Sequence, residues 1–367
     1  MKILIIAPKT SSLLNFRGDL IKAISNKDNE VIAIGPESGF EKELENVGAK
    51  FFQINLKKNS TSILDNIQYL KDLVKIMKKE QPDKIFAYTI KPIIFGSIAG
   101  KRAKVKEIYS MVTGLGYVYA VNTLKTKILR IICGIGYKLA FKYSTKVIFQ
   151  NKDDKSEFIK RRYLKEEKCE VVDGSGVNLE RFKRNDLPKE NVFLMVSRIL
   201  KLKGVKEYFE AAKIVKEKYP KTEFLYVGAE DKTQAALKLE EVQEYMDNKI
   251  VNYCGETSDV PFYIQKCSAF VLPSYYREGI PRTLLEALAM GRPIITTETV
   301  GCKETVVDGV NGFFVPIKDS KALAEKMIYM IENRDKLQSM SDKSFEYCKE
   351  RFDVNIINKR MLEIMKI

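Results

Sequence analysis

Short apolar segments alternate with amphipathic helical segments along nearly the whole chain. In the first half, the expected strands cover residues 2–7, 30–34, 50–54, 84–88, 107–112 and 146–150. A helical pattern follows each of the first four, starting after Asn15, at 40–47, at 63–79 and from Pro92. Parallel strands need crossover connections of this kind, so the alternation predicts a parallel, doubly wound α/β sheet.

A second alternating series begins after a charged segment at residues 183–190, which is typical of an interdomain linker. Its expected strands cover residues 191–196, 223–227, 250–253, 269–272 and 293–296. A chain of 367 residues is too long for one ordinary core. The sequence therefore predicts two Rossmann-like domains at residues 1–186 and 187–352, followed by a short amphipathic helix at 353–367.

The composition excludes several kinds of chemistry. The chain has no histidine and six cysteines without a C-x-x-C pair, which excludes Ser-His-Asp hydrolysis and histidine-ligated metals. Neither half has G-x-G-x-x-G after its first strand, so a dinucleotide redox cofactor is not expected. No apolar run approaches the ~20 residues of a membrane span, and the N-terminal run is too short for a signal peptide, so we expect a cytoplasmic location.

The loop and helix at residues 273–291 carry the most informative side chains. Pro281 is expected to be the first helical residue, with Glu278 on the preceding loop and Glu286 in the first turns. The N–H groups of residues 279–283 would face outward from a helix N-terminus at the carboxyl end of a strand, where α/β proteins bind phosphates. Two acids beside an anion site suit a ligand with hydroxyls and phosphates, such as a nucleotide sugar.

Cations and glycines at other strand ends fit the same ligand. Arg198 is expected at the exit of a strand and Lys203 just before a helix, where both would neutralise a diphosphate. Loops at Gly228 and Val260 would let a base approach the backbone. The alternatives stay open: solvated surface charges, ordinary turn glycines, and a Glu286 favoured only by the helix dipole.

Several ordered motifs resemble the retaining family 4 glycosyltransferases. They are Ser197-Arg198, Lys203-Gly204, the pair Glu278 and Glu286, and the segments 291–295, 301–305 and 311–313. The resemblance implies the GT-B fold, in which two Rossmann-like domains face a central cleft and a final helix returns to the first domain. It implies that Arg198 and Lys203 hold the donor diphosphate.

The resemblance also implies that Glu278 contacts the transferred sugar and Glu286 the ribose, with Arg198, Lys203 and Glu278 as the catalytic residues. The remaining candidate donor-site residues are Gly18, Gly228, Val260, Gly279, Ile280, Pro281, Arg282 and Thr283. No metal or other cofactor is expected.

The first domain is less decisive, because it lacks the Gly-Gly loop and the histidine of many members. The candidate acceptor residues are Asn15, Arg17, Lys91, Thr113, Gly114 and Gly116. Asn15 as a helix N-cap and Lys91 as a surface lysine are the structural alternatives.

Basic residues gather in the first domain. Of the net charge of +15, residues 51–150 carry 18 basic against 5 acidic side chains. The segment 124–142 mixes apolar residues with Lys125, Lys127, Arg130 and Lys138, as in a helix lying on the anionic inner face of the cytoplasmic membrane. The alternative is a helix packed on its own sheet with snorkelling lysines. Nucleic acid is not expected as a partner.

The expected function is transfer of a sugar, with retention, from a UDP-sugar to an undecaprenyl-diphosphate-linked sugar. Within the family, the Asn15-Phe16-Arg17 segment and the Gly114-Leu115-Gly116 loop are similar to members that add N-acetylgalactosamine to a lipid-linked bacillosamine in bacterial N-glycan assembly. Retaining members that transfer another donor sugar in capsule or O-antigen assembly are the closest alternative. A nucleotide-sugar epimerase or hydrolase of the same fold, and a non-catalytic membrane scaffold, are alternatives of other classes.

Overall fold

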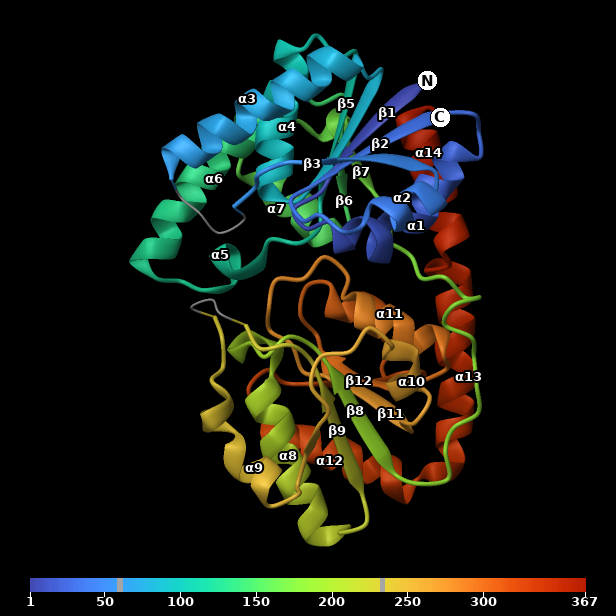
Figure 1. The fold of residues 1–367 in the computed structure, drawn as a ribbon. Coiled ribbons are helices and arrows are strands. Elements are labelled where there is room, and N and C mark those ends of the chain that lie inside the picture. The colour runs from blue at the N-terminus through green and yellow to red at the C-terminus, as the bar shows by residue number, and fades with distance from the viewer. Residues whose placement is uncertain (58–61, 232–234) are drawn as a thin grey trace. The chain divides into compact units, whose positions relative to one another are not determined.

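The computed structural model describes residues 1–57, 62–231 and 235–367. Its contacts divide the chain into two units, Met1–Ser175 with Val354–Ile367, and Gly176–Asp353. Each unit contains one wholly parallel sheet with helices, as Figure 1 shows. The predicted pair of doubly wound α/β units is confirmed.

The first unit has a seven-stranded sheet in the order β3-β2-β1-β4-β5-β6-β7. Its strands are β1 (Lys2–Ile6), β2 (Glu30–Gly35), β3 (Ala49–Gln53), β4 (Lys84–Tyr88), β5 (Glu107–Val112), β6 (Lys146–Phe149) and β7 (Cys169–Val171). Its helices are α1 (Ser11–Ser25), α2 (Glu41–Asn46), α3 (Ile63–Glu80), α4 (Ile90–Arg102), α5 (Gly116–Ala120), α6 (Leu124–Tyr143), α7 (Lys152–Lys160), the 3-10 turn η1 (Glu166–Lys168), and α14 (Val354–Met365).

Alternate residues of β1 show how this sheet is covered on both faces. Ile3 and Ile5 belong to a buried cluster with α1 and α14, whereas Leu4 and Ile6 pack with α3 and α4. A strand buried on both faces must be apolar at every position, which explains the continuous run that starts the chain. The C-terminal helix α14 thus belongs to the first unit's core.

The second unit has a six-stranded sheet in the order β10-β9-β8-β11-β12-β13. Its strands are β8 (Val192–Val196), β9 (Glu223–Val227), β10 (Asn252–Tyr253), β11 (Ala269–Leu272), β12 (Ile294–Thr297) and β13 (Gly312–Val315). Its helices are η2 (Lys201–Lys203), α8 (Val205–Lys218), η3 (Leu239–Glu241), α9 (Gln243–Asp247), α10 (Val260–Ile264), α11 (Arg282–Ala289), η4 (Cys302–Thr305), α12 (Ser320–Glu332) and α13 (Arg334–Arg351). The strand order reverses between β8 and β11, and in such sheets ligands bind beyond the strand ends at this point.

The domain boundary predicted at residues 186 and 187 differs from the observed division. Phe182 is buried in the second unit's core. The fully buried guanidinium of Arg292 donates to the main-chain and side-chain oxygens of Asn185 and to the carbonyl of Asp186. The polar segment is therefore bound to the second unit instead of linking the units, because its carbonyls satisfy a buried cation. The final helix begins at Val354, one residue after the predicted start.

No helix in the described part of the chain is long and apolar enough to cross a membrane.

Candidate functional site

The predicted donor residues of the second unit follow the two strands at its topological switch point. Arg198 comes two residues after β8, and Glu278 lies on the loop after β11. Because the strands are parallel neighbours, their carboxyl ends lie at the same edge of the sheet.

Lys203 and Glu278 form a direct ion pair at this edge. Their side chains are only 14% and 13% exposed. The hydroxyl of Ser274 lies 3.4 Å from the same carboxylate oxygen, and the Lys203 ammonium is 5.6 Å from the centre of the Tyr276 ring. The structure thus brings together the cation and the acid that the sequence assigned to the diphosphate and the sugar.

The loop that carries Glu278 is fixed from two sides. The Tyr275 N–H donates to the Leu202 carbonyl at 2.9 Å, which joins this loop to the turn that carries Lys203. On the other side, the Thr299 hydroxyl donates to the Ser274 carbonyl at 2.8 Å. Gly301 has a φ of +86°, and a Cβ there would lie 2.2 Å from the Gly279 carbonyl oxygen. The motif at 301–305 therefore begins with glycine for steric reasons.

Arg198 is paired with Asp231, a partner that the sequence analysis missed. The two side chains approach to 2.5 Å, with Arg198 51% exposed and Asp231 7% exposed. Asp231 follows β9, the neighbour of β8 in the sheet. A signal was therefore present, since an acid after the adjacent parallel strand is expected at the same sheet edge.

Gly228 is required by the close approach of two backbones. A Cβ there would lie 1.7 Å from the Ser197 carbonyl oxygen, which leaves no room for another residue. The Gly228 N–H donates to the Gly255 carbonyl at 2.9 Å. Main-chain packing thus requires glycine at this position, and the place of Gly228 near a base stays a prediction. Val260, the other residue proposed near the base, is the first residue of α10 and is half-buried.

Helix α11 begins one residue later than expected. Pro281 has a ψ of 118°, so it is the extended cap residue and Arg282 is the first helical residue. The prediction of Pro281 inside the helix was wrong, because its carbonyl is not in the helical orientation. Gly279, Ile280 and Pro281 are buried, with Ile280 in the second unit's core, and Thr283 is half-buried.

Glu286 lies on α11 and is paired with a residue of its own helix. Its carboxylate is 3.1 Å from Nε of Arg282, whose guanidinium also donates to the Gly176 carbonyl. Burial raises the pKa of Glu286, and the positive charges of Arg282 and then Arg181 act against this rise. A poorly hydrated carboxylate with a nearby cation is suited to accept hydrogen bonds from hydroxyl groups.

The first-unit candidates near the first strand occupy different environments. Arg17 is buried, donates to the sulfur of Met111 at 2.9 Å and lies 5.2 Å from the Tyr88 ring centre. Gly18 is buried on the same helix. Asn15 is exposed inside α1, which begins at Ser11, so both the helix start after residue 15 and the N-cap alternative for Asn15 are wrong. The helix also includes Ser11 and Ser12, which precede Leu13.

The other acceptor candidates follow β4 and β5. The Lys91 ammonium donates to the Lys57 carbonyl at 2.7 Å and to the Asn66 side chain at 3.1 Å. Lys91 is half-buried, and burial lowers its pKa against the opposing effect of Asp65. Thr113 and Gly114 lie in the loop after β5, and Gly116 is the first residue of α5; the two glycines have φ values of +107° and +64°.

The four basic residues assigned to a membrane differ in their surroundings. Lys125, Lys127 and Lys138 are exposed on α6. The Arg130 guanidinium instead donates to the carbonyls of Val118 and Val121. Arg130 therefore joins α6 to the preceding segment, which distinguishes it from the three exposed lysines.

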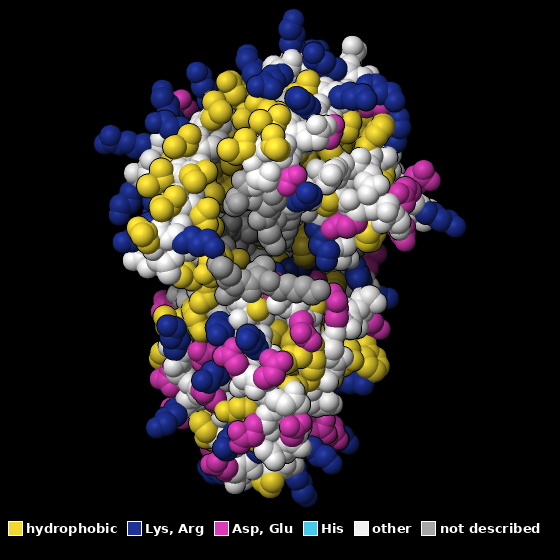
Figure 2. Space-filling model, turned by 60° about the vertical axis from the view of Figure 1, so that its left-hand side comes forward, with side chains coloured by type: hydrophobic (Ala, Val, Ile, Leu, Met, Phe, Trp, Pro, Cys, Tyr) yellow, Lys and Arg dark blue, Asp and Glu magenta, His cyan; other side chains and the backbone are white. Residues whose placement is uncertain are grey.

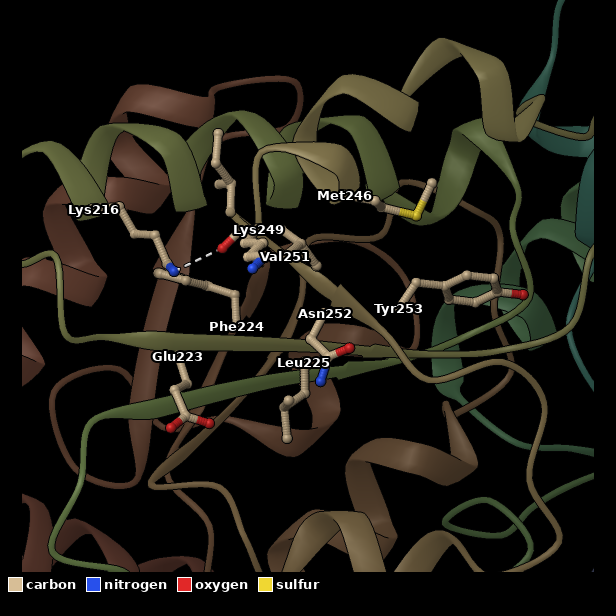
Figure 3. A pocket seen from close by; sticks show the side chains of 10 residues that line it. Lys216, Glu223, Phe224, Leu225, Met246, Lys249, Val251, Asn252 and Tyr253 are labelled. Carbon is tan, nitrogen blue, oxygen red and sulfur yellow. Dashed lines mark hydrogen bonds between the residues drawn. The ribbon is translucent and has the colours of Figure 1, made fainter.

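A pocket of about 570 Å³ lies elsewhere in the second unit, against β9 and β10 (Figure 3). It is lined by Lys216, Glu223 and Lys249, among others, and contains none of the predicted site residues. Glu223 starts β9, so this hollow lies toward the amino end of that strand, whereas the site residues follow the carboxyl ends. In the described residues, no cluster of three or more acidic or cysteine side chains is placed to hold a metal ion.

Two family profiles match the chain. The family described as glycosyl transferases group 1 matches residues 177–347, and the family described as glycosyl transferase 4-like matches residues 2–151. The N,N'-diacetylbacillosaminyl-diphospho-undecaprenol alpha-1,3-N-acetylgalactosaminyltransferase of Campylobacter jejuni is 31% identical, over 99% of this chain and 98% of its own length. A UDP-Gal:alpha-D-GlcNAc-diphosphoundecaprenol alpha-1,3-galactosyltransferase of Escherichia coli is 28% identical over 85% of this chain and 82% of its own.

Solved structures agree on the fold. The Anabaena protein HepE, in complex with UDP and glucose, superposes with a TM-score of 0.82 and 20% identity, covering 100% of this chain and 99% of its own. A sucrose-phosphate synthase from Thermosynechococcus elongatus has a TM-score of 0.81 and 17% identity, covering 100% and 98%. These neighbours have the GT-B fold, which confirms the fold class expected from the sequence.

Proposed function

Because this chain belongs to the group 1 glycosyltransferases, with a glycosyltransferase 4-like first half, we propose that it transfers an N-acetylhexosamine from a UDP-sugar to an undecaprenyl-diphosphate-linked sugar. N-acetylgalactosamine is the donor sugar named for the Campylobacter relative. The pathway would be the assembly of a bacterial N-glycan or surface glycan. The ion pair of Lys203 and Glu278 at the switch point of the second sheet is the observation that carries this proposal.

The geometry of the pair supports a division of roles in the donor site. Lys203 reaches the sheet edge next to the loop before α11, where a diphosphate would receive hydrogen bonds from the helix N-terminus. When the diphosphate binds, it competes with Glu278 for the ammonium and leaves the carboxylate to accept hydroxyls of the transferred sugar. Arg198 would add a second cation, and Glu286 would accept hydroxyls of the ribose.

Retention at the anomeric carbon follows from a front-face route in this proposal. The acceptor hydroxyl attacks from the side on which the diphosphate leaves, and a departing phosphate oxygen takes its proton. Lys203 and Arg198 stabilise the charge that develops on the leaving group, as fixed cations in a poorly hydrated site do. The route requires no histidine and no metal ion, since the side-chain cations supply the positive charge.

We place the acceptor on the first unit, near Arg17, Lys91 and the loop at residues 113–116, at the inner face of the cytoplasmic membrane. Exposed Lys125, Lys127 and Lys138 support the location, because each lysine near an anionic leaflet contributes about 1 kcal/mol of attraction. Exchanging these three for glutamine should weaken binding to anionic vesicles, whereas Arg130→Gln should lower stability.

The test measures UDP release by the purified protein from UDP-GalNAc, UDP-GlcNAc and UDP-galactose, with and without an undecaprenyl-diphosphate-linked sugar. We expect release only with the acceptor, and a product whose anomeric configuration equals that of the donor. Release without an acceptor would indicate a hydrolase, and an altered nucleotide sugar an epimerase.

Variants assign the roles within the same assay. Lys203→Ala and Glu278→Gln should each lose about 100-fold or more in kcat. Lys201→Ala is the matched control, since Lys201 belongs to the same turn but its ammonium pairs with Glu241 at 3.3 Å. Near-normal turnover of Arg198→Ala would contradict the diphosphate role of Arg198.

A further inference from the structure

Helix α6 presents apolar side chains on its outward face. The exposed aliphatic residues of this helix are Leu124, Ile128, Ile131, Ile132, Ile135 and Leu139. At ~100° per residue they fall within an arc of about 100°, so they form one stripe along the helix. An ordinary surface helix has polar residues on its outward side, so this stripe requires an explanation.

The apolar stripe is not the face through which α6 packs on its own unit. A second set of residues on the opposite side is buried, namely Thr126, Gly134, Tyr137, Ala140 and Phe141. Exposed Lys125, Lys127 and Lys138 flank the apolar stripe on both sides, and the helix contains no acidic residue. The helix is thus packed on its unit through one apolar face and presents another with a basic border.

The first turns of α3 also expose aliphatic side chains. Ile63, Leu64 and Ile67 are exposed, with Leu64 79% exposed. Helices α3 and α6 both pack against α4, and they lie on the same side of the first unit in Figure 1. Figure 2, turned so that this side comes forward, shows hydrophobic side chains gathered on the first unit with Lys and Arg around them. We call the nine exposed aliphatic residues named for α3 and α6 the apolar ridge.

We propose that the apolar ridge inserts into the acyl-chain region of an anionic bilayer, with the flanking lysines at the headgroups. The inference deepens the membrane location within the proposed function: the contact is apolar penetration and not charge attraction alone. A second copy of the chain fits less well, because facing ridges would bring like-charged lysine borders together. Aliphatic side chains bordered by lysines match a layer of hydrocarbon beneath anionic headgroups.

The chain offers a direct probe of insertion because it contains no tryptophan. Ile135→Trp and Leu64→Trp each place a single fluorophore on the ridge, and Ile317→Trp places one on an exposed aliphatic position of the second unit. With vesicles of phosphatidylcholine and phosphatidylglycerol, the emission of the two ridge variants should shift to the blue. Lipids brominated on the acyl chains should quench it, while the Ile317→Trp emission stays unchanged.

A second measurement compares partitioning. Ile131→Gln with Ile135→Gln should lower the vesicle partition coefficient by at least about tenfold, since each isoleucine loses a favourable transfer from water. Glutamine keeps the helix propensity of a good helix former. Ile317→Gln with Ile356→Gln makes the same exchange at two exposed positions off the ridge, and should leave partitioning unchanged.

Each other result would overturn the proposal. Vesicle binding without acyl-chain quenching would mean a headgroup contact only. A blue shift without lipid that grows with protein concentration would mean self-association of the ridge. No binding to the vesicles of phosphatidylcholine and phosphatidylglycerol would exclude a bilayer as the partner of the ridge. None of these readouts uses a nucleotide sugar, so failure of the proposed transferase activity would leave the insertion result standing.

Discussion

The ion pair of Lys203 and Glu278 allows a double-mutant test of whether the candidate site is assembled before any ligand binds. Lys203→Met keeps the apolar stem of the lysine but leaves the Glu278 carboxylate, 13% exposed, without its cation. Leaving a mostly buried charge in this state costs about 2–3 kcal/mol, which lowers the melting temperature by about 5–10 °C for a unit of this size. Glu278→Gln has a similar cost, because it leaves the mostly buried Lys203 ammonium without the Glu278 carboxylate.

The double variant separates this pair energy from other effects. Removing both charges should cost less than the sum of the single changes by about 2 kcal/mol, because neither partner is then left alone. Thermal unfolding measured by calorimetry gives these values, with Lys201→Met as a control within about 0.5 kcal/mol of the parent. If the stability costs of the two single variants add up to the cost of the double variant, the ion pair is absent in solution. The double variant should regain stability without regaining sugar transfer, since both proposed donor contacts are gone.

Three further predictions concern the pH response and the packing. Burial raises the pKa of Glu286, so this acid stabilises the fold most below its unfolded pKa and loses that contribution as the pH rises through its folded pKa. In urea titrations, the difference in unfolding free energy between the parent and Glu286→Gln should therefore fall from about pH 4 upward. Gly228→Ala, whose Cβ would meet a carbonyl, should cost several kcal/mol in urea unfolding, whereas Gly255→Ala, with nothing within 4 Å, should cost about 1 kcal/mol. Lys84→Met removes an ammonium that lies 2.6 Å from the Met365 carbonyl oxygen, and should make α14 more sensitive to proteolysis. Lys27→Met is the control, since it removes only an exposed contact with the Ile367 carbonyl, and should leave this sensitivity unchanged.

Much of the fold was predictable because the buried strands are continuous apolar runs that few other structures accommodate. The edge strands β7 and β13 were missed, because Glu170 interrupts the short apolar pattern of β7 and Asn311-Gly312 at the start of β13 is typical of a turn. The boundary near residue 186 was misplaced for a different reason. A charged segment looks like a linker in sequence, and only the structure reveals that buried Arg292 binds its carbonyls.

The site was predictable to the extent that each residue follows a strand. Lys203 and Glu278 meet as expected, because the order of the strands determines which loops are neighbours. The partners of Arg198 and Glu286 were missed although the sequence holds a signal for each, since Asp231 follows the neighbouring strand and Arg282 stands four residues before Glu286 on one helix. Helix α6 packs on its unit through one apolar face, as one interpretation expected, and a second apolar face is exposed; contact with a membrane stays a prediction.

The two ends of the second unit lie side by side. Val177 and Asp353 form a parallel bridge, and the Val177 N–H donates to the Phe352 carbonyl at 2.8 Å. The segment 176–353 therefore starts and stops at one place, like an insertion in a host domain whose own chain is interrupted only there. Exchanging this segment between relatives would replace the strands around Lys203 and Glu278 as a whole and leave the host with its apolar ridge, so the proposed donor site and the proposed membrane contact can change independently.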